Sequence, residues 1–343
     1  MRERPHVDYI DGLRAVAVLS VLAYHSFLGD GRPQPERIVC LARGVDLFFV
    51  ISGFCLAFPM LIQKGGFRPD VSTYAAFQLR RFSRIAPPFY LALAIFALLS
   101  FTSFGFPGAA GIGLDRHPVR EFFTDLAFLM PPVPLYNSAF WTLGIEARWY
   151  LLCPLLVALY LRSRWVFFGL GAALYGVYFL TAYGIADMGT LPSFMAGIVA
   201  ADVVLRGQRW RKYAWMGAAA ALALGIHTSN GDHGDPIWHL AGFFLVVAGS
   251  TPVLSRVLTW RPLVAVGLAS YSIYLYHAPF VTWLEQKGVT PVLAAVSAAC
   301  IGWIAWAVLE RPLASNGFRR TLEALLTAPL RRRPHSSPHP EAA

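Results

Sequence analysis

Residues 8–29, DYIDGLRAVAVLSVLAYHSFLG, form an apolar stretch with charged residues near its start and a histidine near its end. A run of about 20 apolar residues suits a helix that crosses a membrane. Arg14 and His25 are far apart along this helix, by about 16 Å of axial rise, yet within about 20° of one face. The stretch therefore predicts a membrane helix that presents a cation and an imidazole on the same side at two depths.

Two interpretations of this helix are open. In the first, Arg14 extends to the membrane surface and His25 is a buried, hydrogen-bonded core residue. In the second, both belong to a functional site, because ionisable groups inside membranes are costly and usually serve a function. The remainder of the chain decides between them.

Composition indicates an all-α, polytopic membrane protein. The 343 residues are 56% hydrophobic and 14% charged, with a mean hydropathy of +0.51, which is unlike a soluble domain. We expect a bundle of about ten transmembrane helices. Their predicted ranges are 8–29, 44–63, 84–104, 140–161, 165–182, 189–206, 213–228, 237–254, 264–284 and 291–310. Pro87 and Pro88 are expected to kink or delay the third of these helices.

The charged residues fix a predicted topology. The formal net charge is +10, but the basic residues lie between the apolar runs rather than in one patch, which argues against nucleic acid as a partner. Placing the N-terminus in the cytoplasm puts most Lys and Arg residues on the cytoplasmic side. We therefore expect a plasma-membrane protein with both termini cytoplasmic, a transmembrane domain over 1–313, and a tail over 314–343 that is partly amphipathic and then disordered.

Two further features are read from spacing. The four cysteines are scattered and form no CxxC motif, which predicts neither a disulfide framework nor a bound metal. The connection over 105–139 contains an apolar piece, FFTDLAFLM, that is too short to cross a membrane and is expected to be re-entrant or interfacial.

Several polar residues fall at similar depths in the outer half of different predicted helices. They are His25, Asp46, Ser52, Glu146 and His277. Each alone fits a hydrogen-bonded core group. Together they favour a cavity capable of acid–base chemistry, because ionisable groups inside membranes face one another or water. His25 is the candidate base, and either Glu146 or Asp46 is a candidate to orient its ring.

A second cluster is expected at the opposite, cytoplasmic side. Arg81 and Arg84 are spaced i, i+3 on one helix face, and Arg14 lies near the cytoplasmic start of the first helix. Anchoring the topology is one role for such residues; binding phosphate is the one we favour, because guanidinium groups bind phosphate in a bidentate manner. A phosphorylated donor with a long arm, such as acyl-CoA, fits a separation of about 16 Å between Arg14 and His25.

At these residues the sequence resembles the acyltransferase-3 family of bacterial membrane O-acyltransferases over about residues 8–313. The resemblance rests on an ordered set of motifs, namely YIDGLRAVAVLSVLAYH, GVDLFFVISGF, the RxxR of Arg81 to Arg84, FWTLGIEARWY, SYSIYLYHAPF and ERPL at Glu310 to Leu313. It implies that Arg14 and His25 are an essential pair, with His25 catalytic, and that Arg81 and Arg84 lie on the donor side. Ser52, Tyr274 and His277 match recurrent family positions, which we assign to substrate binding.

The resemblance implies transfer of a short acyl group, most simply acetyl, from cytoplasmic acyl-CoA to a hydroxyl of a cell-surface glycan or glycosylated acceptor. Acyl-CoA is then a donor substrate, and no permanently bound cofactor is expected. Two alternatives remain open: a macrolide or other secondary-metabolite acceptor, and a transporter in which His and Glu relay protons. The acceptor, the choice between direct transfer and an acyl-enzyme, and the oligomeric state are not indicated by the sequence.

Overall fold

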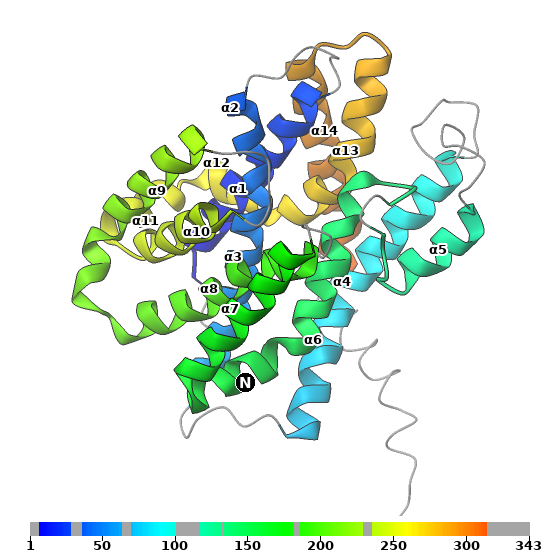
Figure 1. Ribbon diagram of the computed structural model, residues 1–343. Helices are drawn as coiled ribbons and strands as arrows, with labels where there is room; N and C mark the ends of the chain where they lie inside the picture. Colours follow the sequence, from blue (N-terminus) through cyan, green and yellow to red (C-terminus); the bar gives the residue numbers. More distant parts are fainter. Residues whose placement is uncertain are drawn as a thin grey trace, which may run out of the picture.

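The computed structural model describes residues 7–28, 36–63, 70–100, 117–131, 134–181, 186–228 and 235–313, and all regular structure within these ranges is helical (Figure 1). The first half contains α1 (Tyr9–Leu28), α2 (Glu36–Val39), η1 (Cys40–Arg43), α3 (Gly44–Leu61), α4 (Val71–Ser100), α5 (Pro118–Leu126), η3 (Ser138–Phe140), α6 (Trp141–Arg162) and α7 (Arg164–Leu180). The second half contains α8 (Ala186–Arg206), η4 (Arg209–Tyr213), α9 (Ala214–Thr228), α10 (Pro236–Gly249), α11 (Pro252–Leu258), α12 (Arg261–Leu268), α13 (Ser270–Gln286), α14 (Pro291–Ala305), the π-helix η5 (Trp306–Glu310) and α15 (Arg311–Leu313). The expected all-α class is confirmed.

Among the described residues, six helices are long and apolar enough to cross a membrane, and up to eight spans result if two bent helix pairs each count as one. The pairs are α10 with α11, bent by 97°, and α12 with α13, bent by 69°. The chain is thus a multi-pass membrane protein, but the ten expected spans are not confirmed. Two of the expected spans correspond to α7 and α9, which have 17 and 15 residues and are shorter than the ~20 residues a span needs.

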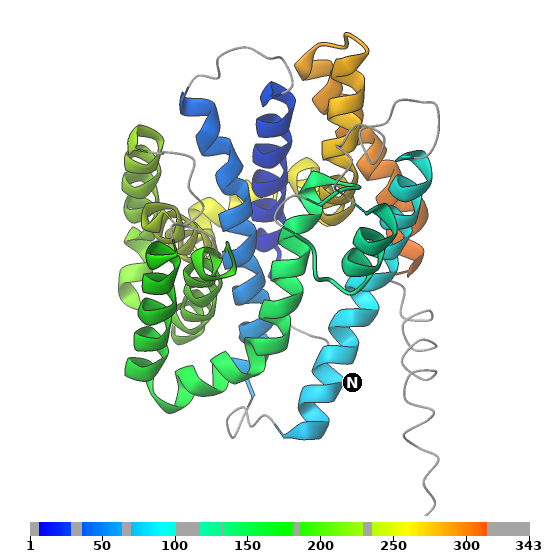
Figure 2. The ribbon, with the colours of Figure 1, turned by 45° about the vertical axis from the view of Figure 1, so that its right-hand side comes forward.

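Helix α4 differs from the expectation in a way that matters for the site. It begins at Val71 rather than at 84 and continues through Pro87 and Pro88. Arg81 and Arg84 therefore lie within the helix, not at its entrance. Helix α5 has nine residues, includes the first five residues of the apolar piece predicted to be too short to cross, and lies beside α4 (Figures 1 and 2). The tail over 314–343 lies outside the described residues, and the orientation of the termini remains a prediction.

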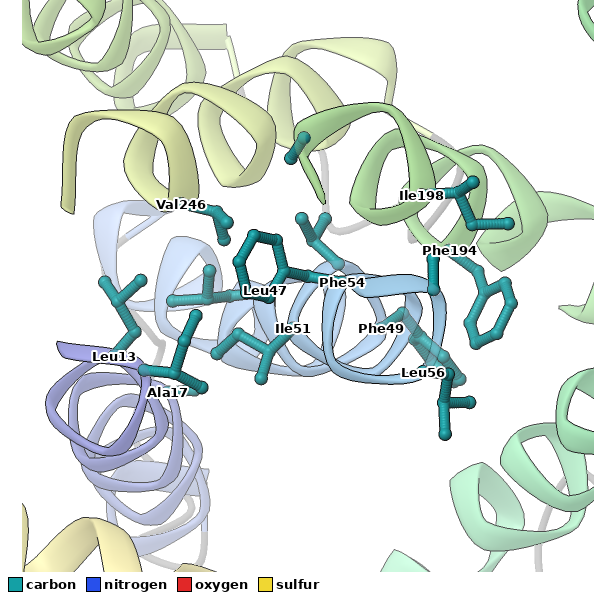
Figure 3. Close-up of a cluster of buried hydrophobic side chains, with 14 of the residues drawn as sticks. Leu13, Ala17, Leu47, Phe49, Ile51, Phe54, Leu56, Phe194, Ile198 and Val246 are labelled. Atoms are coloured by element: carbon teal, nitrogen blue, oxygen red, sulfur yellow. The ribbon is translucent and has the colours of Figure 1, made fainter. Parts of the chain in front are cut away.

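Helix α3 occupies the centre of the packing. Figure 3 shows side chains of α1, α8 and α10 surrounding it, including Leu13, Phe194 and Val246. Leu13 is 2% exposed, and Phe194 and Val246 are fully buried. Since α3 is apolar on nearly every side, it suits this central place.

Small residues let α3 and α8 approach closely. A Cβ added at Gly53 would lie 2.1 Å from the main-chain oxygen of Phe194, and one added at Gly197 would lie 2.1 Å from that of Val50. Glycines at such helix crossings are common in membranes, where backbone contact replaces the hydrophobic driving force. The contact fixes α3, which supplies one wall of the cavity described next.

Candidate active site

The first functional side chain, Arg14, is held by the start of α1. Its Nη1 donates to Asp11 Oδ1 at 2.8 Å, and its Nη2 lies 3.5 Å from Cys55 Sγ on α3. Two glycines allow this end of α1 to pack closely against neighbouring backbone. A Cβ at Gly12 would lie 2.1 Å from the last main-chain oxygen of α11, and one at Gly267 would lie 1.8 Å from the main-chain oxygen of Asp11. Backbone contact between α1 and the α11–α12 region therefore positions the guanidinium.

Arg14 lines a cavity with residues from α3, α4, α6, the α12–α13 break and η5. Six of the predicted site residues meet there: Arg14, Ser52, Arg81, Arg84, Glu146 and Tyr274. The cavity encloses about 160 Å³, whereas a single water needs about 10–15 Å³ by the same kind of measure. It therefore has room for a ligand group and is not a packing defect.

The three arginines approach this cavity from two helices. Arg14 comes from α1, and Arg81 and Arg84 come from successive turns of α4. The Arg81 guanidinium also lies over the Phe77 ring, 5.6 Å from its centre. Guanidinium groups that line one cavity suit a phosphate-bearing ligand, because each can donate two parallel hydrogen bonds to phosphate oxygens.

Glu146 lies in the same cavity as the arginines. Its carboxylate accepts hydrogen bonds from Ser52 Oγ at 2.7 Å and from the Tyr150 hydroxyl. Tyr150 was not among the site residues predicted from the sequence. Its spacing of i, i+4 from Glu146 on α6 could have indicated this contact, since residues four apart on a helix are neighbours.

A second carboxylate, Glu310, also lines the cavity and was not assigned a role from the sequence. It is the last residue of the π-helix η5, and its Oε2 accepts from Ser272 Oγ at 2.5 Å. Short π-helical segments occur frequently at functional sites. The carboxylates of Glu146 and Glu310 thus share the cavity with the three guanidinium groups.

His25 and His277 form a pair outside the set of residues that line this cavity. Their rings are edge to face with centres 4.7 Å apart, and His277 Nε2 lies 3.2 Å from His25 Nδ1. His277 is fully buried, while His25 keeps partial exposure. The two predicted histidines, one in the last turn of α1 and one in the middle of α13, are therefore in direct contact.

The hydrogen bonds of the pair define one consistent set of tautomers. His277 Nδ1 lies 2.7 Å from the Tyr274 carbonyl, which only accepts, so this nitrogen carries a proton. The His277 Nε2 lone pair then accepts from His25 Nδ1–H, which also lies 3.0 Å from the Val21 carbonyl. His25 Nε2 is left with a lone pair, which is the form that a general base requires.

Tyr274 lies between the cavity and the histidines. It lines the cavity, its ring centre is 5.3 Å from that of His277, and the Phe48 ring packs edge to face against it at 5.8 Å. Its hydroxyl is 2.7 Å from the Thr142 hydroxyl. This aromatic residue therefore forms the wall shared by the two parts of the site.

The candidate carboxylates lie away from the hydrogen bonds of His25. Among the described residues, those bonds go to Val21 and His277. Asp46 is buried at the start of α3, with Oδ2 3.6 Å from Nη1 of buried Arg43. Within the part of the chain that the structure covers, no three His, Cys, Asp or Glu residues are grouped as a metal site would need. The catalytic roles of Asp46 and Glu146 remain predictions.

Comparison with known proteins identifies the family. Residues 7–310 match a family described as an acyltransferase domain, the acyltransferase-3 group. The chain is 25% identical to peptidoglycan O-acetyltransferase OatA of Listeria monocytogenes over 92% of this chain and 57% of the relative. It is 24% identical to O-acetyltransferase OatA of Staphylococcus aureus over 90% and 57% of the two chains, and 26% identical to the putative peptidoglycan O-acetyltransferase YrhL of Bacillus subtilis over 92% and 56%.

The chain spans a little over half the length of these relatives. No solved structure matches it. The family match covers every element that contributes to the cavity and to the histidine pair. The chain therefore belongs to the acyltransferase-3 family, whose members are enzymes that transfer acyl groups.

Proposed function

We propose that this protein transfers an acetyl group from acetyl-CoA to a hydroxyl of a cell-surface glycan. The observation that carries the proposal is a histidine pair with a free imidazole nitrogen, separated by one tyrosine from a cavity that three arginines line. Acyl transfer to an alcohol needs both parts: a base for a poor nucleophile and a site for a charged donor.

The donor phosphates bind Arg14, Arg81 and Arg84 in this proposal. The rise along α1 from Arg14 to His25 is about 16 Å, which suits a donor whose reactive thioester lies at the end of a long arm. The proposal requires the arginine-lined cavity to open toward the cytoplasm, where acyl-CoA is made. It therefore retains a plasma-membrane location with cytoplasmic termini and a transmembrane domain that ends near residue 313.

His25 acts as the general base. Its Nε2 takes the proton of the acceptor hydroxyl while the hydroxyl oxygen attacks the thioester carbonyl, and the C–S bond then breaks. The departing CoA thiolate receives the proton back from His25. During this step the His25 ring is positively charged, and its Nδ1–H donates to His277 Nε2, so that His277 steadies the charged ring.

For the acceptor we infer peptidoglycan as the first candidate, because two of the relatives carry that substrate in their names. The test combines purified protein in lipid vesicles, acetyl-CoA labelled in its acetyl group, and soluble peptidoglycan fragments. We expect acceptor-dependent CoA release and fragments heavier by one acetyl group, with both signals lost in His25→Gln.

A transporter would give a different result in the same assay. Label would cross the vesicle membrane with no CoA released, and that outcome would refute acetyl transfer. Release of CoA with acetylated macrolides but not with glycan fragments would keep the enzyme class and reject the glycan acceptor. Comparing muropeptides from cells with and without the protein by mass spectrometry then tests the acceptor in its natural setting.

A further inference from the structure

Helix α13 contains a proline two residues after His277. Pro279 lies inside the helix, and proline has no main-chain N–H to donate to the carbonyl four residues earlier. That carbonyl belongs to Leu275, which is fully buried and lies two residues before His277. A buried carbonyl deprived of its helical partner needs another donor.

Asn137 supplies that donor from a distant part of the chain. Its Nδ2 donates to the Leu275 carbonyl at 2.7 Å, and its side chain is 2% exposed. Its other side-chain atom, Oδ1, accepts from the Ala139 main-chain N–H at 2.9 Å, which caps η3. One amide thus joins the turn before α6 to the proline-interrupted part of α13.

The same turn contacts α13 a second time. The Thr142 and Tyr274 hydroxyls are 2.7 Å apart, and the Tyr274 hydroxyl donates to the Ala139 carbonyl at 3.2 Å. These contacts lie one turn before His277 along α13, and the Asn137 contact lies two residues before it. The backbone that carries His277 is therefore held by residues 137–142.

We propose that Asn137 is a positioning residue for the reaction, acting through Leu275 to hold His277 Nε2 against His25 Nδ1. The inference rests on the proposed acetyl transfer for its kinetic effect, although the geometric effect on the histidines does not depend on it. Without the amide donor, α13 shifts to satisfy the Leu275 carbonyl, and the 3.2 Å contact between the rings lengthens.

The test is a double-mutant cycle with Asn137→Asp and Pro279→Ala. Asn137→Asp keeps an oxygen to cap Ala139 and replaces the donor to Leu275 with a carboxylate oxygen, which cannot donate when ionised. Pro279→Ala restores a main-chain N–H within reach of the Leu275 carbonyl, so that the helix no longer needs Asn137. Asn137→Asp alone should lower kcat by about 2- to 30-fold, at most the loss expected when the hydrogen bond from the charged His25 ring to His277 is removed altogether. The KM for acetyl-CoA should stay unchanged, since the three arginines of the cavity lie on α1 and α4 and not on α13.

In the Pro279→Ala background, Asn137→Asp should lower kcat far less, because the two substitutions act on the same Leu275 carbonyl and their effects are not additive. An equal loss of kcat in both backgrounds, or a change confined to KM, would overturn the proposal. If Asn137→Asp fails to accumulate in membranes, the double variant must restore both accumulation and turnover, and failure to do so would also overturn it.

A readout that needs no turnover separates this proposal from the proposed function. Nitrogen NMR of isotope-labelled histidine distinguishes the two imidazole tautomers, with His25→Gln used to assign the His25 signal. We expect one His25 tautomer in the wild type, protonated at Nδ1, and a mixture in Asn137→Asp that Pro279→Ala reverses. Unchanged tautomers in Asn137→Asp would refute the positioning role, whereas a wild type that releases no CoA would refute acetyl transfer alone.

Discussion

Replacing His277 with asparagine tests the histidine pair most directly. The asparagine amide lies near the place of imidazole Nδ1, so that His277→Asn keeps a donor for the Tyr274 carbonyl, which Nδ1 contacts at 2.7 Å. It removes the atom corresponding to Nε2, which accepts from His25 Nδ1 at 3.2 Å. His277→Gln is the matched control, because a glutamine amide oxygen reaches the place of Nε2 and accepts the same hydrogen bond.

The magnitude follows from the charge on His25 during the reaction. A neutral hydrogen bond contributes about 1 kcal/mol net, and one to a charged group about 1.5–3 kcal/mol. The bond to His277 therefore stabilises the protonated His25 ring by about 0.5–2 kcal/mol more than the neutral ring. This difference corresponds to about a 2- to 30-fold loss of kcat in His277→Asn. His277→Gln should lose clearly less.

The assay is acceptor-dependent CoA release by purified protein in vesicles, measured over a range of acetyl-CoA concentrations. The loss should appear in kcat and leave the KM for acetyl-CoA unchanged, because His277 is not among the residues that line the arginine cavity. Wild-type turnover in His277→Asn would refute the reasoning. So would a loss in His277→Gln as large as that in His277→Asn, since only the asparagine variant lacks the acceptor.

Two further predictions test the cavity and the packing that supports it. Arg81→Ala and Arg84→Ala should each raise the KM for acetyl-CoA about tenfold or more, because a hydrogen bond to a charged group contributes about 1.5–3 kcal/mol. Arg206→Ala is the control and should leave this KM unchanged, since Arg206 lies at the end of α8 and is paired with a carboxylate. Gly53→Ala should lower thermal stability by about 1–3 kcal/mol, since its Cβ would lie 2.1 Å from a main-chain oxygen. Gly169→Ala, whose Cβ would meet nothing within 4 Å, should not lower it, and equal melting curves for the two would contradict the packing argument.

Helical spacing was sufficient to predict that Arg14 and His25 lie near the two ends of one helix, eleven residues apart. Arg81 and Arg84 were expected at a helix entrance, but α4 begins at Val71 and both residues lie within it. His25 and His277, which were predicted to lie at similar depths, are in contact in the structure. Depth alone did not show which side chains contact one another. Glu146 was expected in the same layer as His25, but it lines the cavity with the three arginines.

The bends between α10 and α11 and between α12 and α13 could not be predicted from the sequence, for a physical reason. Residues 264–284 read as one apolar run, yet α12 ends at Leu268 and α13 begins at Ser270 with a 69° bend. Hydropathy reports burial and not direction, so a change of direction inside an apolar run leaves no periodic signal. The close contact of Gly267 with α1 is a tertiary feature, and it fixes the path of the chain at the break.

The separation of the arginines from the histidines has an electrostatic consequence. Two unit charges about 16 Å apart interact by about 1 kcal/mol at an effective dielectric constant of about 20. Arg14 would thus oppose the positive charge that His25 gains during the proposed reaction by less than that amount, because the Asp11 carboxylate offsets part of its charge. Arg81 and Arg84 would add to this repulsion. Glu146 and Glu310 share the cavity and offset part of this repulsion. A donor carrying several phosphate charges would offset the rest, so the base would be most effective when the donor site is filled. That coupling gives the carboxylates in the cavity a role that does not require either of them to touch His25.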